Sequence, residues 1–108
     1  MRLSVIGLLP VAMTVLVANK AVKCSSIELS DLTTGELFEA RKQTKEGEFI
    51  AISEFVAKAK LVDGEGNKHD VTYAMLRDMS SANFKKLEEL DYDLQAKLNA
   101  ESLENQSS

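Results

Sequence analysis

Residue types that support chemistry are scarce in this sequence of 108 residues. It has one cysteine (Cys24), one histidine (His69), no tryptophan and only six other aromatic residues. A lone cysteine excludes an intrachain disulfide, and a lone histidine with no cysteine beside it gives no basis for a transition-metal site. With a formal charge of −4 and few rings for stacking on bases, we expect no nucleic-acid partner. We expect Cys24 to be a buried small side chain and His69 to lie in a solvated loop.

Sequence motifs of catalysis are also missing. There is no glycine-rich phosphate loop, no Gly-x-Ser-x-Gly elbow and no Cys/His pairing. Residues 63–67 (Asp-Gly-Glu-Gly-Asn) superficially resemble a calcium loop, but Gly66 stands fourth instead of sixth, and Ala74 stands twelfth, where a glutamate is required. Carboxylates such as Glu36 and Glu39 fit the solvated face of a helix. We therefore predict no catalytic, metal-binding or cofactor-binding residues, and a protein that is not an enzyme.

The composition is that of a small globular protein. Apolar residues make up 44% of the chain and charged residues 28%, and 108 residues suffice for one core only. We predict a single domain over residues 1–98 and a polar, disordered tail over residues 99–108. The predicted fold class is α+β, with a small N-terminal β-hairpin followed by three or four short helices.

Residues 3–18 carry no charge and allow two interpretations. After a basic second residue they have the outline of a signal segment or membrane anchor, although no Ala-x-Ala cleavage site follows and the run is short for a bilayer span. The other interpretation is a β-hairpin, because apolar residues alternate at period two: Val11, Met13, Val15 and Val17. A turn at residues 18–21 and a slip in phase at residues 25–26, as a bulge would give, complete this pattern. Both interpretations stay open, and we favour the hairpin, with a membrane partner not expected.

Thr33 and Glu36 have the spacing of a capping box. The Thr33 hydroxyl can accept the Glu36 N–H while the Glu36 carboxylate accepts the Thr33 N–H, which fixes the start of a helix. We predict that this helix covers residues 34–43 and buries Leu37, Phe38 and Ala40.

Apolar spacing predicts further helices downstream. One covers residues 48–61 and ends at the turn cluster of residues 63–67. Residues 71–73 fit either a brief strand or the start of a short helix that is capped by Thr72 and reaches Met79. A final helix, capped by Ser80 or Ser81, carries an apolar stripe made of Phe84, Leu87, Leu90, Leu94 and Leu98.

Two segments resemble a known family. Residues 28–40 (Glu-Leu-Ser-Asp-Leu-Thr-Thr-Gly-Glu-Leu-Phe-Glu-Ala), with a cysteine shortly upstream, are similar to a signature region of the tail assembly chaperones of Mu-like, contractile-tailed phages. Residues 75–87 (Met-Leu-Arg-Asp-Met-Ser-Ser-Ala-Asn-Phe-Lys-Lys-Leu) resemble the second signature region of that family. Together the two cover 26 of the 108 residues, and neither is a catalytic fingerprint.

The resemblance implies a phage or prophage protein that takes part in virion assembly. Such a chaperone binds the tape measure protein, and possible further partners are other tail proteins and a second copy of itself. It acts in the cytoplasm of the bacterial host and is absent from the mature virion. Two alternatives stay open, namely a minor structural tail component and, if residues 1–21 are a signal segment, a small secreted or membrane-anchored interaction protein. The candidate partner-binding residues are the adaptable or aromatic apolar ones: Phe49, Phe55, Met75, Met79 and Phe84.

Overall fold

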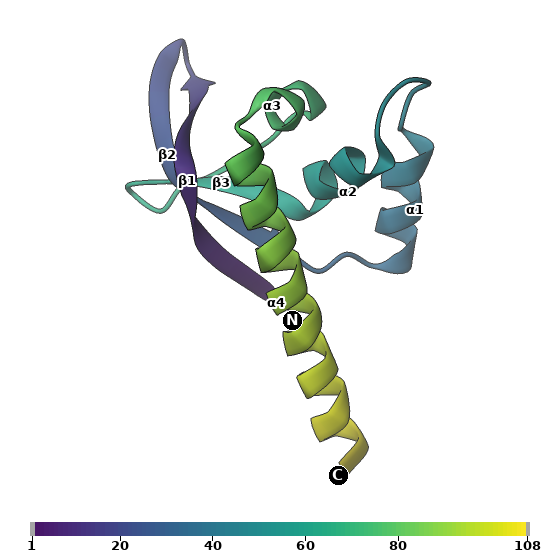
Figure 1. Cartoon of the computed structure of the whole chain (residues 1–108). Helices are drawn as coiled ribbons and strands as arrows, with labels where there is room; N and C mark the ends of the chain where they lie inside the picture. Colours follow the sequence, from purple (N-terminus) through teal and green to yellow (C-terminus); the bar gives the residue numbers. More distant parts are fainter. Residues whose placement is uncertain (1, 108) are drawn as a thin grey trace.

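The computed structural model describes residues 2–107 as one antiparallel sheet with helices packed on it (Figure 1). The strands, which lie in sequence order, are β1 (Ser4–Val17), β2 (Lys20–Ser30), β3 (Ala59–Asp63) and β4 (Lys68–Asp70). The helices are α1 (Thr34–Lys42), α2 (Ile50–Lys58), α3 (Tyr73–Asp78) and α4 (Ser81–Ser107). The predicted α+β class, with an N-terminal hairpin followed by helices, is confirmed.

Strands β1 and β2 form the hairpin that the alternating pattern predicts. Their turn is tight: Val17 pairs with Lys20, and the two residues between them, Ala18 and Asn19, have φ of 51° and 66°. Positive φ at both central residues is the requirement of a two-residue turn whose twist matches that of the strands. Asparagine adopts this geometry readily, so Asn19 favours the turn at this point of the chain.

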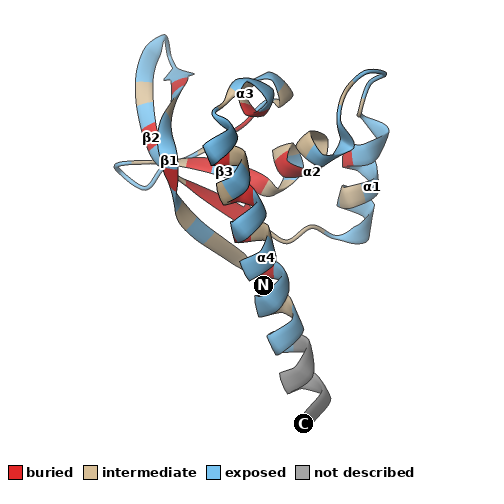
Figure 2. Cartoon of the chain, viewed as in Figure 1, coloured by how far each residue is buried: buried red, intermediate tan, exposed pale blue. Residues whose placement is uncertain are grey.

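The core lies between one face of the sheet and helix α4. Gly7, Ile27 and Leu61 are paired neighbours across three strands and share this face. On α4, the predicted stripe is confirmed, because Leu87, Leu90 and Leu94 are at most 4% exposed and pack in the same cluster. In Figure 2 the buried residues gather in the middle of the sheet, behind α4, whose visible side is mostly exposed or intermediate. A Cβ atom on Gly7 would lie 2.8 Å from Leu90 Cδ2, so glycine permits the close approach of α4 to β1.

Strand β1 is interrupted where it crosses the start of α4. Leu8 pairs with Ser26 and Met13 pairs with Cys24, so four residues of β1 stand opposite one residue of β2. The slip predicted near residues 25–26 is confirmed. Against β2 the extra residues belong to β1, and against β3 the extra residue is Ser25 of β2, because Cys24 pairs with Asp63 and Ser26 with Val62. The fully buried Asn83 of α4 spans the gap: its Oδ1 accepts the Val11 N–H (2.9 Å), and its Nδ2 donates to the Val11 carbonyl (2.8 Å). The side-chain amide of Asn83 thus makes the two backbone hydrogen bonds that a neighbouring strand would otherwise make with Val11.

The second predicted helix is only partly right. Helix α2 ends at Lys58, and Ala59 to Asp63 form β3 instead of a continued helix. Ala59 and Leu61 are buried against Leu29 and Ile27 of β2, while the intervening Lys60 is exposed. A central place in the sheet thus outweighs the helical spacing, because the backbone of this segment pairs with strands on both sides.

The remaining expectations concern the C-terminal half. Thr72 caps α3, with its hydroxyl accepting the Met75 N–H at 3.2 Å, so of the two alternatives for residues 71–73 the helix start is correct. Ser80 Oγ accepts the Ala82 N–H at the start of α4. Helix α4 continues to Ser107, where a disordered tail from residue 99 was expected, while the domain boundary at residue 98 stays a prediction. None of the helices in residues 2–107 combines the length and the apolar character needed to cross a bilayer.

Candidate functional site

The five candidate partner-binding residues do not form one surface. Phe55 is buried and packs edge-on against Phe84, with ring centroids 5.6 Å apart and planes at 87°. Phe84, Met75 and Met79 are partly buried and pack against the core. Phe49 alone projects into solvent, with 69% of its surface exposed. Four of the five therefore hold helices α2, α3 and α4 to the sheet, and Phe49 is left as the accessible one.

Exposed large apolar side chains gather at two places instead. The first is β1, which carries five of the nine in the described chain: Ile6, Leu8, Val11, Leu16 and Val17. Ile6 and Leu8 flank Gly7 in the strand and therefore point to the face of the sheet opposite α4. They are 58% and 71% exposed, and the strand that carries them has no charged residue. On this edge strand only Pro10 and the interruption of the register between Leu8 and Met13 oppose pairing with another chain.

The second place is the pair of helices α1 and α2, which lie beside each other on the far side of the sheet from the hairpin turn (Figure 1). Phe49 and Ile50 are exposed at the start of α2. Phe38, which we expected to be buried, is 57% exposed on α1, and the Arg41 guanidinium lies 5.7 Å from its ring centroid. The prediction for Phe38 was wrong because α1 is covered on one side only, where Ala40 meets α2.

A groove of about 430 Å³ runs between these two helices. Its floor is made of small or apolar side chains, those of Ala40 of α1 and of Val56 and Ala57 of α2, with the Ser53 hydroxyl on the same face of α2. Its rim carries three carboxylates, those of Glu36, Glu39 and Glu48, with one ammonium, that of Lys45. In Figure 2, α1 is exposed over most of its surface, so the groove faces solvent.

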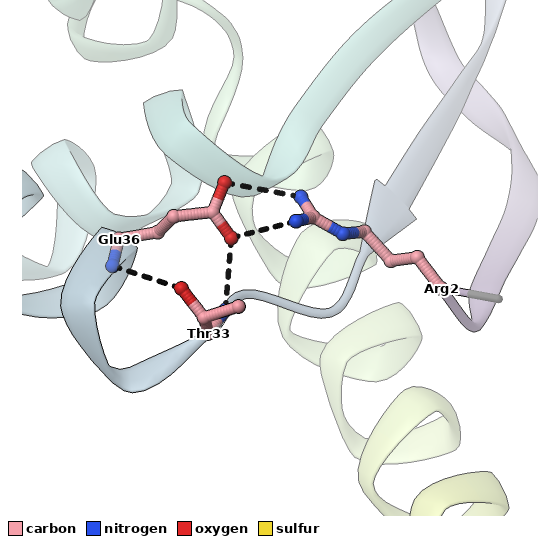
Figure 3. Close-up of polar contacts among 3 residues, drawn as sticks. All are labelled: Arg2, Thr33 and Glu36. Carbon is pink, nitrogen blue, oxygen red and sulfur yellow. Dashed lines mark hydrogen bonds and ion pairs between the residues drawn. The ribbon is translucent and has the colours of Figure 1, made fainter.

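The capping box fixes the start of α1 and one carboxylate of the rim (Figure 3). Thr33 Oγ1 accepts the Glu36 N–H at 3.1 Å, and Glu36 Oε1 accepts the Thr33 N–H at 2.9 Å, so the predicted capping box is confirmed. Arg2 adds two contacts, with Nη2 at 2.7 Å from Glu36 Oε1 and Nη1 at 3.3 Å from Oε2. The backbone hydrogen bond from Thr33, followed by the bond from Arg2, lowers the pKa of Glu36. Glu36 therefore stays ionised, and its charge is already engaged.

One further contact joins the two walls of the groove, and another ties the start of α2 to α3. Arg41 Nε of α1 donates to Glu54 Oε1 of α2 at 2.7 Å. No side chain caps the start of α2, where Phe49 is the N-cap residue. The Phe49 N–H donates to the Tyr73 hydroxyl of α3 at 2.9 Å. Both bonds join elements distant in sequence, so neither could be predicted from local spacing.

The two residues with the most reactive side chains serve the fold. Cys24 is fully buried, and burial, with the nearby Asp63 charge, raises the pKa of its thiol, so the expected inert role is confirmed. His69 is not in a solvated loop, contrary to expectation. It lies in β4 with its side chain 18% exposed, and its Nε2 is 2.9 Å from Asp63 Oδ2. This hydrogen bond, above all, lowers the pKa of Asp63.

Metal-ligating side chains do not converge: over the described residues no three of the types His, Cys, Asp and Glu stand close enough to hold an ion. The groove thus remains the feature whose shape and charge offer most to a partner. Comparison of the chain with protein-family models, with curated proteins and with solved structures gives no match.

Proposed function

We propose that this protein is a non-catalytic tail assembly chaperone that binds the tape measure protein while the tail tube of a contractile-tailed phage assembles. The observation that carries the proposal is the amount of large apolar surface left exposed on a chain whose core is already filled. Of the nine large apolar residues found exposed among those whose burial the structure describes, eight lie on β1, on α1 or at the start of α2. Contiguous apolar surface on a small protein marks a place where another chain binds.

The resemblance to the chaperone family falls on elements that frame this surface. Residues 28–40 comprise the end of β2, the capping box and most of α1, and residues 75–87 comprise most of α3 and the start of α4. The first segment therefore supplies one wall of the groove between α1 and α2. The second contributes Asn83, which holds β1 in place. A chaperone for a long, aggregation-prone helical protein needs such surfaces and no catalytic group.

The expected compartment is the cytoplasm of the bacterial host, with the protein released before the virion matures. In the hairpin, Leu9 and Val15 of β1 belong to the buried core, so removal of residues 1–21 as a signal segment would leave β2 without its partner strand. We expect the mature protein to retain residues 1–21. Mass spectrometry of the protein recovered from cells measures this directly, and a mass lower by about 20 residues would contradict the proposed compartment.

The experiment that tests the function is co-expression with the tape measure protein of the same phage or prophage. The soluble fraction of the tape measure protein should rise, and a complex should survive gel filtration in moderate salt, because apolar contacts are little affected by screening. Leu8→Lys and Phe49→Lys, at side chains 71% and 69% exposed, should lower that solubility without unfolding the chaperone. Tyr92→Lys is the matched control, since Tyr92 is 76% exposed on α4, outside both apolar surfaces.

Two results would count against the proposal. If the tape measure protein stays insoluble and no complex elutes, the protein is not its chaperone. If the protein is instead found in purified virions at a fixed copy number, it is a minor structural component of the tail.

A further inference from the structure

We infer that the groove between α1 and α2 binds an amphipathic helix whose apolar stripe is flanked by lysine or arginine residues. The inference rests on the proposed function, in that the helix would be a segment of the tape measure protein, and it assigns both the site and the chemistry of that segment. It follows from the shape of the floor, from the continuation of that floor onto the start of α2, and from the sign of the charge on the rim.

The floor suits a helix that lies across it. Ala40 and Ala57 carry single methyl groups, so the backbone of a bound helix can approach closely, while Val56 gives a larger apolar contact between them. Ile50 and Ala57 are seven residues apart on α2, which places them on one face of the helix, and Phe49 is the residue that precedes its first turn. The apolar floor therefore continues toward two side chains that are 69% and 51% exposed.

The rim favours a basic partner. Glu36 is engaged by Arg2, whereas neither Glu39 nor Glu48 forms an ion pair with any side chain that the structure describes. Each accepts one hydrogen bond through Oε1 only: Glu39 from Gln43 Nε2 at 3.3 Å, and Glu48 from the Lys45 N–H at 2.9 Å. Their Oε2 atoms remain available to cationic groups of a ligand. Lys45 is the single positive charge among the lining residues.

The geometry also selects a helix over an extended chain. Both walls are helices of nine residues, each about 13 Å long at 1.5 Å per residue, and no strand edge borders the groove. An extended peptide would find no row of unpaired backbone groups there. A helix that lays apolar side chains at positions i, i+3, i+4 and i+7 into the groove would bring its flanking lysines over the rim carboxylates.

Binding is tested with the whole protein and a synthetic peptide of about 14 residues that has leucine at i, i+3, i+4 and i+7 and lysine elsewhere. Fluorescence anisotropy measures its dissociation constant. A second peptide, with glutamate in place of each lysine, keeps the same apolar stripe. We expect the basic peptide to bind at least about tenfold more tightly. Equal affinities would overturn the inference.

A pair of variants separates the groove from general attraction between a basic peptide and an acidic protein. Ala57→Glu puts a bulky carboxylate in the floor, so binding in the groove should weaken about tenfold. Non-specific attraction should instead become stronger, because the protein gains a negative charge. Ala51→Glu is the matched control, since Ala51 is exposed on α2 and does not line the groove. Unchanged binding by Ala57→Glu would overturn the assignment of the site.

The rim is tested separately in case Ala57→Glu lowers stability. The double variant Glu39→Lys/Glu48→Lys should weaken binding of the basic peptide at low salt, and the difference from the natural protein should shrink as salt rises. No difference at low salt would overturn the role of the rim. If the Ala57→Glu variant still keeps the tape measure protein soluble, the groove is not the binding site, and the proposed chaperone function is unaffected. Peptide binding without any effect on the tape measure protein would refute the function and leave the groove.

Discussion

Asn83 offers the sharpest test of how this fold is held together. Asn83→Ala removes both hydrogen bonds to Val11 and leaves that residue's N–H and carbonyl without partners. A buried polar group left unpaired costs about 1–3 kcal/mol. Because Val11 is 49% exposed, water can reach its backbone in part, so the low end of that range applies to each group. With the lost packing of a fully buried side chain, the free energy of unfolding should fall by about 2–3 kcal/mol.

The change should be plain in a thermal melt followed by circular dichroism. For a domain of this size 1 kcal/mol corresponds to about 4–8 °C, so Tm should fall by about 10–20 °C. Asn99→Ala is the control on the same helix, because Asn99 is exposed and should tolerate the change within about 0.5 kcal/mol. If the two variants melt together, the amide of Asn83 does not serve as the missing neighbour of β1.

Asn83→Asp refines the same test. It keeps the acceptor for the Val11 N–H and turns the donor into an oxygen that faces the Val11 carbonyl. Burial disfavours the carboxylate, so the pKa of the new side chain should be raised in the folded protein. The protonated acid can donate to the carbonyl, so stability relative to the natural protein should be best below about pH 4. It should then be lost as pH rises through the raised pKa.

The remaining predictions concern other contacts of the fold. Thr33→Ala should lower the free energy of unfolding by about 1 kcal/mol in a denaturant titration, because it removes the capping side chain of α1. The control, Thr34→Ala, should leave the free energy of unfolding unchanged, because Thr34 does not cap the helix. Gly7→Ala should cost about 1–2 kcal/mol, since its methyl group would overlap a leucine of α4, whereas Gly64→Ala, with nothing within 4 Å, should not. The hydrogen bond with His69 lowers the pKa of Asp63, so the stability that the Asp63 carboxylate contributes is present above its unfolded pKa and is lost on acidification. Asp63→Asn should therefore flatten the loss of stability between about pH 5 and pH 3. A pH profile identical to that of the natural protein would contradict that role.

Elements set by neighbours in the sequence were predictable. The capping box needs only Thr33 and Glu36, and the two partners lie three residues apart. The hairpin follows from alternation in β1 and a short turn at Asn19. By contrast, β3 has five residues, and Ala59 and Leu61 fit a helical stripe as well as a strand face until β2 and β4 are placed beside them.

The candidate site was less accessible to sequence reasoning. Apolar spacing cannot tell whether a face meets the core or solvent, so Phe55 and Phe84 were grouped with Phe49 although they pack on each other. The groove arises from how α1 sits on α2, which depends on contacts such as that between Arg41 and Glu54. The sequence did not indicate the partner of Asn83, because that partner lies 72 residues away. The one usable clue was a polar residue inside an apolar helical stripe.

The separation of Val11 and Asn83 along the chain has a consequence during synthesis. At about 5–20 residues per second, a ribosome that has added Val11 needs about 4–14 s to add Asn83, 72 residues later. Within that interval β1 and β2 are both synthesised before the helix that closes the gap of the hairpin and covers its inner face. Each nascent chain therefore carries an uncharged strand with unpaired backbone groups, and neighbouring ribosomes on one message bring such strands close together. The rate of translation through α4 thus bears on the yield of folded protein, although no contact in the finished molecule depends on it.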